Sequence, residues 1–169
     1  MRRVMHDEQS DATRSDAHFL RAAIRLSEQG MQKGAGGPFG CVVVRNGAIV
    51  GQGHNEVLAS NDPTAHAEVV AIRRASAACG DFRLADCTLY TSCEPCPMCL
   101  GAIHWARIPR VVYAATRADA AAAGFDDDLL YREFALPLER RSLRLEPLLR
   151  AEAAPILRAW SQLPQRVPY

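Results

Sequence analysis

Three cysteines stand within seven residues of one another, and this cluster constrains the fold more than any other feature of the sequence. The segment TSCEPCPMC places them at Cys93, Cys96 and Cys99, with Pro95 and Pro97 between them. Proline is common in the first turn of a helix, so the segment predicts a strand end followed by a helix that begins near Cys96. Residues three apart share one helix face, so Cys96 and Cys99 should point in the same direction. The thiols could be inert core residues, a disulfide or metal ligands.

Composition and the start of the chain argue against the disulfide. The 169 residues are 49% hydrophobic and 23% charged, which fits one globular domain that buries its own core. The first residues carry two arginines but no apolar run, so we expect no export signal and a cytoplasmic location, where disulfides are rare. No stretch is apolar and long enough to span a bilayer. The formal net charge of +1 indicates no general attraction to nucleic acid or to a membrane surface.

A histidine and an acid lie upstream, in the segment TAHAEV. We expect a helix from about Thr64 to Ala78, with Asp62 or Thr64 as its cap and a proline in its first turn. His66 and Glu68 would then both lie at the start of this helix.

Two helix starts could therefore meet at one cation. His66, Cys96 and Cys99 would supply one imidazole and two thiolates, and would leave a fourth tetrahedral position for water. The rival arrangement is a closed structural site that adds Cys93 as a fourth ligand. Glu68 favours the open site, because a structural zinc needs no free acid beside it. His-x-Glu with a distant Pro-Cys-x-x-Cys is the signature of the zinc deaminases.

The rest of the chain alternates strands with helices, which predicts a layered α/β sheet. An Asn-Gly pair between two β-rich runs predicts a hairpin, and a strand on each side of the cysteine helix suggests a parallel crossover. Residues 125–137 are ambiguous. We expect residues 1–15 to be a mobile extension and residues 16–169 to be a single domain. The expected helices are 16–33, 64–78, 96–107, 117–123 and 153–163; the expected strands are 41–45, 48–53, 87–92, 110–115 and 142–149.

At these motifs the chain resembles the cytidine deaminase-like zinc hydrolases, and within them the branch that acts on guanine. The similarity runs from about His18 to the C-terminus. It is carried by GGPFG, SNDPTAHAE, LYTSCEPCPMCLGAI, WAR, AGFDD and the final Tyr169. The metal motif identifies the superfamily, whereas AGFDD and the terminal aromatic residue are more particular to the guanine branch.

The resemblance implies an α/β fold of the three-layer α/β/α sandwich type, with a mixed central sheet. It also implies a homodimer in which the C-terminal segment is exchanged between subunits. Zn²⁺ would be bound by His66, Cys96 and Cys99, and Glu68 would be the proton shuttle.

Further residues match the family's substrate contacts. Asn55 stands where the family places a purine-contacting asparagine, and Phe39 and Trp105 match positions that line the base pocket. Asp127 matches a second acid near the leaving amino group. Tyr169 would close the pocket of the partner subunit.

The acid run offers two alternatives to Asp127, namely Asp126 and Asp128, and it could also be a solvated loop. The predicted reaction is hydrolysis of guanine to xanthine and ammonia, in which a zinc-bound hydroxide attacks the base, as a cytoplasmic step of purine catabolism. The alternatives are a guanosine or other nucleoside deaminase, a tRNA adenosine deaminase and a non-catalytic zinc-stabilised module. The near-neutral charge makes a nucleic-acid substrate unlikely to fit, because such enzymes need a basic face.

Overall fold

A four-stranded mixed sheet with the order β2-β1-β3-β4 organises the first part of the chain. The structure is a computed structural model that describes residues 2–168, with side chains described for residues 13–168. The chain divides into two compact units, Met1–Asp127 and Asp128–Tyr169. Among the described residues, no helix combines the length and the apolar character that crossing a bilayer requires.

The sheet is built from one hairpin and one parallel crossover. Strand β1 (Gly40–Arg45) pairs antiparallel with β2 (Ala48–His54) and with β3 (Cys87–Cys93), and β3 pairs parallel with β4 (Arg110–Ala115). Asn46 and Gly47 both have positive φ, 51° and 77°, as a two-residue type I′ turn requires. The predicted hairpin and the predicted parallel crossover are both confirmed.

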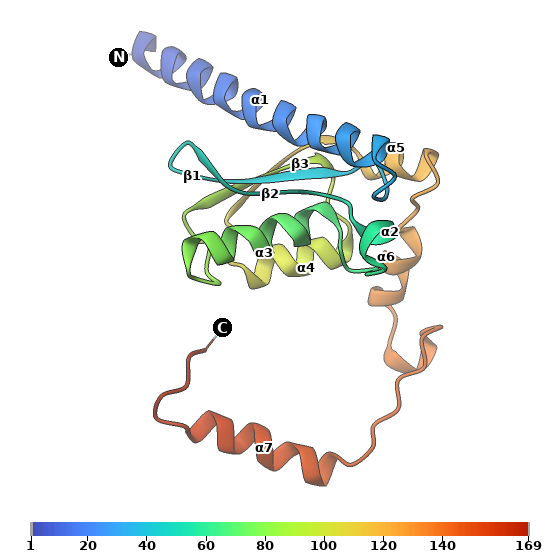
Figure 1. The fold of residues 1–169 in the computed structure, drawn as a ribbon. Coiled ribbons are helices and arrows are strands. Elements are labelled where there is room, and N and C mark those ends of the chain that lie inside the picture. The colour runs from blue at the N-terminus through green and yellow to red at the C-terminus, as the bar shows by residue number, and fades with distance from the viewer. Residues whose placement is uncertain (1, 169) are drawn as a thin grey trace. The chain divides into compact units, whose positions relative to one another are not determined.

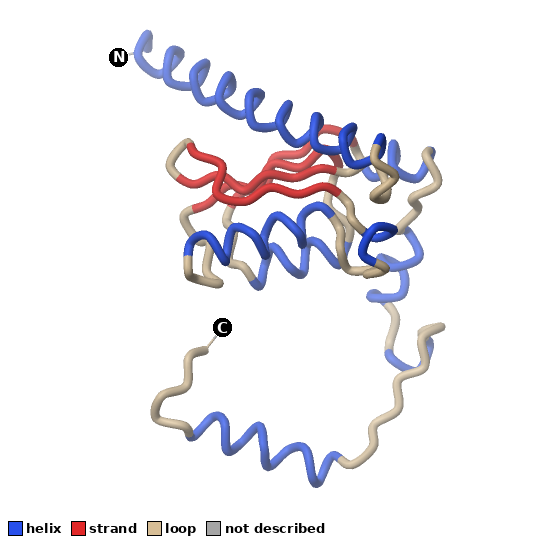
Figure 2. The backbone as a smooth tube through the Cα atoms, in the orientation of Figure 1, coloured by secondary structure: helices blue, strands red, loops and turns tan. Residues whose placement is uncertain are grey.

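Helices cover both faces of the sheet (Figures 1 and 2). Helix α1 (Arg2–Gln32) lies on one face, and α3 (Ala67–Cys79) and α4 (Pro97–Trp105) lie on the other. Alternation along β1 divides the core, because Val42 and Val44 pack toward Phe19 of α1, whereas Cys41 and Val43 pack on the side of α3 and α4. The expected three-layer α/β/α sandwich with a mixed sheet is confirmed.

Three expected boundaries differ from the structure. The first helix begins at Arg2 instead of Asp16, because no glycine or proline interrupts the chain before Gly30. The second predicted helix is α3, and it begins at Ala67 because Asp62 accepts hydrogen bonds from the backbone and the hydroxyl of Thr64 and so forms a turn. The strand expected at 142–149 is absent from the described backbone, where these residues form no ladder.

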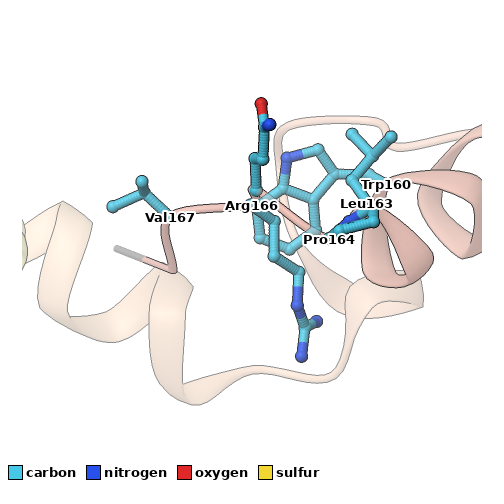
Figure 3. A pocket seen from close by; sticks show the side chains of 6 residues that line it. Trp160, Leu163, Pro164, Arg166 and Val167 are labelled. Carbon is cyan, nitrogen blue, oxygen red and sulfur yellow. The ribbon is translucent and has the colours of Figure 1, made fainter.

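The C-terminal unit contains α6 (Asp128–Ala135), a 3-10 turn (Leu138–Arg140) and α7 (Arg150–Gln162). Helix α7 confirms the predicted last helix. The tail after it turns beside the indole of Trp160, over which the guanidinium of Arg166 lies 5.8 Å from the ring centroid (Figure 3). None of residues 128–168 is buried.

Candidate functional site

The site begins where two helices start. His66 is the N-cap of α3 and Cys96 is the N-cap of α4, and both residues have extended backbone conformations. Neither side chain makes a capping hydrogen bond to its own helix, so each is free to turn toward the other. Pro97 occupies the first turn of α4, as the sequence predicted.

His66, Cys96 and Cys99 form a compact group of three donor atoms (Sγ, Sγ and Nδ1) that all lie within 4.8 Å of one another. The Nδ1 atom of His66 lies 3.5 Å from Sγ of Cys96 and 3.6 Å from Sγ of Cys99. Ligands held about 2.0–2.1 Å (nitrogen) and 2.3 Å (sulfur) from one tetrahedral zinc would lie about 3.5–3.6 Å apart. The donor set and its spacing therefore fit a zinc ion with one open position.

The three side chains of this cluster differ in how their pKa values are shifted. Hydrogen bonds from Cys99 and His66 lower the pKa of the Cys96 thiol to about 4, although burial acts in the opposite direction. The pKa of Cys99 is raised by its contact with Cys96, by burial and by the nearby Glu68. The pKa of His66 is raised chiefly by its contact with Cys96. A metal ion binds the deprotonated forms of these side chains, so its binding would displace thiol protons.

Glu68 lies beside the three donors without belonging to them. It is 5% exposed, and burial raises the pKa of its carboxyl. Its Oε1 accepts a hydrogen bond of 3.0 Å from Thr91, and its Oε2 accepts one of 3.3 Å from Cys99. A buried acid whose two oxygens are fixed next to a metal site is suited to carry a proton.

Cys93 does not join the group. It ends β3, and its thiol donates to the backbone carbonyl of Thr116, 3.5 Å away. The remaining cysteines are free thiols; Cys41 and Cys87 are buried, and Cys79 is half-buried. This geometry favours the open three-ligand site over the closed four-ligand site.

Asn55 is held by the loop that precedes β1. It is 5% exposed, and its Oδ1 accepts the backbone N–H groups of Gly37 (3.3 Å) and Val57 (3.2 Å). A Cβ atom on Gly36 would approach this oxygen to 2.0 Å, so only glycine allows the loop to close around the amide. With the oxygen occupied, Asn55 has only its N–H donors left to offer a ligand.

The segment around Asn55 lies next to the metal group. The backbone N–H of Glu56 donates to the carbonyl of Ala65, one residue before His66. The hydroxyl oxygen of Thr91, which donates to Glu68, also lies 3.5 Å from the backbone carbonyl oxygen of Gly40, so the end of the glycine-rich loop is close to the residue that contacts Glu68.

Aromatic and acidic residues complete the surroundings. Phe39 packs edge-to-face against Phe125, with ring centroids 4.9 Å apart. Asp127 is half-buried, and its pKa is raised by burial and by the nearby Cys96, with Arg117 acting in the opposite direction. Asp127 is thus close enough to Cys96 for the charge of that thiolate to act on its pKa, and its role as a second acid stays a prediction.

The other predicted substrate contacts are less closely tied to the cluster. Asp128 forms an ion pair with Arg132 one turn along α6, 3.1 Å apart, which separates its role from that of Asp127. Trp105 ends α4 and is 61% exposed, and its place in a base pocket stays a prediction. Tyr169 lies outside the described residues.

Two contributors to the site were missed by the sequence reasoning. Thr91 is fully buried and contacts Glu68 across 23 residues of sequence, and Phe125 contacts Phe39 across a longer separation. Strand alternation could have placed Thr91 on the same face as Leu89, toward α3, but nothing local reveals its partner.

Comparison with known proteins agrees with this geometry. The sequence profile of the cytidine and deoxycytidylate deaminase zinc-binding region matches residues 13–115. The chain is 50% identical to a guanine deaminase of Bacillus subtilis over 89% of its own length and 97% of that protein. It is 41% identical to a tRNA-specific adenosine deaminase of Streptococcus pyogenes, over 85% of its own length and 87% of that protein.

A solved structure gives the same result. The X-ray structure of guanine deaminase from Bacillus subtilis superposes with a TM-score of 0.87 at 50% identity, and the match covers 90% of this chain and 98% of that one.

Removal of the Thr91 hydroxyl should destabilise the protein through Glu68. Thr91→Val keeps the side-chain volume but leaves a buried carboxyl oxygen without its donor, which costs about 1–3 kcal/mol of unfolding free energy. Thr91→Ser is the matched control, because it keeps the hydroxyl and loses only a methyl group, worth about 0.8 kcal/mol. Urea unfolding of the three proteins measures both effects. A valine variant as stable as the wild type would contradict this role for Thr91.

Proposed function

The chain belongs to the cytidine and deoxycytidylate deaminase zinc-binding family, and we propose that it is a zinc-dependent guanine deaminase. The reaction consumes guanine and water and releases xanthine and ammonia. The observation that carries the proposal is the group of His66, Cys96 and Cys99 with the buried acid Glu68 beside it. The high identity to a guanine deaminase over nearly the whole chain supports the choice of guanine.

His66, Cys96 and Cys99 would hold the zinc ion, since Nδ1 of His66 lies 3.5–3.6 Å from both sulfur atoms. Two thiolates and a neutral imidazole balance the charge of the dication and leave one position open. Zinc in such a site supplies the Lewis acidity that makes water a nucleophile near neutral pH.

Glu68 moves the protons of the reaction. Its Oε1 is fixed by Thr91, and its Oε2 lies 3.3 Å from Sγ of Cys99, one of the proposed zinc ligands. From there it takes a proton from the attacking water and returns protons to the ring nitrogen and to the leaving amine. Burial raises the pKa of this carboxyl, which makes it a stronger proton acceptor than an exposed glutamate.

Asn55 and Asp127 select the base. Asn55 offers amide N–H donors, which suit the oxo group and the ring nitrogens of a purine. Asp127 accepts from the amino group that leaves, and Phe39 and Trp105 line the pocket around the ring. A site built to hydrogen-bond such groups rejects analogues that lack them, because its buried polar atoms would stay unpaired.

The enzyme works on a free base in the cytoplasm, as a step of purine breakdown. Its six cysteines are all free thiols, which suits a reducing compartment. The formal net charge of +1 offers little general attraction for a polynucleotide.

Replacement of Glu68 tests the proposal. Glu68→Gln keeps the shape of the side chain and removes its capacity to exchange protons, so kcat for guanine should fall by about 10²–10⁴-fold with zinc content unchanged. Glu28→Gln, the same change at an exposed acid of α1, is the matched control and should retain full activity.

Ammonia release measures both variants, with a substrate panel of guanine, guanosine, adenine, cytosine and tRNA. We expect guanine to be preferred. Preference for guanosine, or for a tRNA adenosine, would replace the proposed substrate with that one, and zinc binding without turnover of any substrate would indicate a non-catalytic module.

The C-terminal unit is exchanged between the two subunits of a homodimer, with Tyr169 over the pocket of the partner. The exposed apolar surface of this unit supports the proposed exchange, since none of residues 128–168 is buried and the apolar side chains of α7 are largely exposed. The exposed fractions are 71% for Ile156, 73% for Leu157 and 41% for Trp160. A segment without a core of its own gains stability only by packing on another surface.

Subunit mixing distinguishes exchange from closure of a subunit's own pocket. Deletion of Val167–Tyr169 should weaken guanine turnover while zinc content is retained, because the pocket loses its cover. When this protein is refolded together with the Glu68→Gln protein, exchange predicts recovery of activity. The intact acid of one subunit then receives the intact tail of the other. Absence of recovery in proven mixed dimers would contradict the exchange.

A further inference from the structure

The loop that carries Asp127 is fixed at its base by the end of a short helix. Helix α5 (Arg117–Ala122) is followed by Gly124, whose φ of 93° turns the chain in a way that favours glycine. The backbone N–H of Gly124 donates to the carbonyl of Ala121, and that of Phe125 donates to the carbonyl of Ala120, each at 2.9 Å. These two bonds set the direction in which Phe125 leaves the helix.

The start of α5 is anchored just as firmly. Thr116 and Asp119 form a capping box, and the backbone N–H of Arg117 donates to the carboxylate of Glu94 at 3.0 Å. Glu94 lies in the segment between Cys93 and Cys96. The start of α5 is therefore tied to the cysteine segment, whereas the loop that follows α5 needs a separate contact to hold it in place.

Phe125 provides that contact. Its ring meets Phe39 edge-to-face, with an interplanar angle of 85°, although 45% of the residue is exposed. A Cβ atom on Gly37 would approach ring atoms of Phe39 to 2.9 Å and of Phe125 to 3.0 Å, so both rings close over this glycine. The backbone N–H of Gly37 is one of the two that donate to Oδ1 of Asn55. Gly37 thus contacts Phe125, from the loop of Asp127, as well as Asn55 and Phe39.

We propose that Phe125 is a positioning residue. Its ring contact with Phe39, above Gly37, fixes the position of Asp127 relative to Asn55. This inference rests on the proposed deamination of guanine, in which Asp127 and Asn55 contact different edges of the same base. An exposed aromatic ring with no such role would be an ordinary surface residue. Instead, the two rings pack edge-to-face and leave no room for a side chain at position 37, which indicates a specific packing contact.

The kinetic test uses Phe125→Leu and Phe125→Tyr, with Phe82→Leu as the matched control because Phe82 is a similarly exposed phenylalanine. Loss of the ring should let Asp127 move relative to the reacting amino group, and small displacements of this kind cost about 10–10²-fold in rate. We therefore expect Phe125→Leu to lower kcat for guanine at least about tenfold with KM changed less. Phe125→Tyr should restore kcat, and Phe82→Leu should leave it unchanged.

A double-mutant cycle asks whether the effect passes through Phe39. Phe125→Leu should lower kcat much less in the Phe39→Leu background than in the wild type, because the contact is already lost there. An unchanged kcat in Phe125→Leu, or an equal loss in both backgrounds, would overturn the proposal.

Hydrogen exchange tests the coupling without reference to activity. Both Phe125→Leu and Phe39→Leu should speed amide exchange in residues 36–37 and in residues 124–127, with zinc content unchanged. Exchange confined to the mutated segment would overturn the coupling even if kcat falls. If the wild-type protein does not release ammonia from guanine, the proposed function fails by itself, and the exchange data still decide whether the two segments are coupled.

Discussion

The requirement that two helices begin within ligand distance of one cation governs the first unit of this protein. His66 and Cys96 are both helix N-caps, and they meet only because α3 and α4 lie on the same face of the sheet. Strand β3 supplies the connection, since it runs directly into the segment that contains Cys96. The mixed sheet, the parallel crossover and the split core can all be understood as the frame that keeps these two helix starts together.

A second constraint is that the polar groups of the site are fixed before a ligand arrives. Thr91 occupies one oxygen of Glu68, and two backbone N–H groups occupy the oxygen of Asn55. Each residue therefore presents one defined end: a carboxylate oxygen in the first case and amide donors in the second. Preorganisation of this kind reduces the rearrangement that a reaction requires, which is the main route by which polar sites accelerate chemistry.

The sequence was informative where the signal is local. The Asn-Gly turn and the proline in the first turn of α4 depend on a few neighbouring residues, and each predicted the element found. The motifs around His66 and around Cys96 and Cys99 are likewise local, and together they predicted the cluster. The predicted start of α3 was too early because an aspartate such as Asp62 gives the same sequence pattern in a turn as at a helix cap. In the structure it accepts the hydrogen bonds of a turn. The role of Thr91 depends on a contact between segments distant in sequence, as does that of Phe125. Residues 142–149 had a strand-like composition but have no neighbouring strand to pair with among the described residues.

The central claim is that the site is open, with three protein ligands and a free acid beside them. X-ray absorption at the zinc edge of the purified protein tests this claim most directly. The account predicts one zinc per chain with two sulfur neighbours at about 2.3 Å and two nitrogen or oxygen neighbours at about 2.0–2.1 Å. Three sulfur neighbours would show that Cys93 closes the site, and would contradict both the open position and the catalytic role of Glu68.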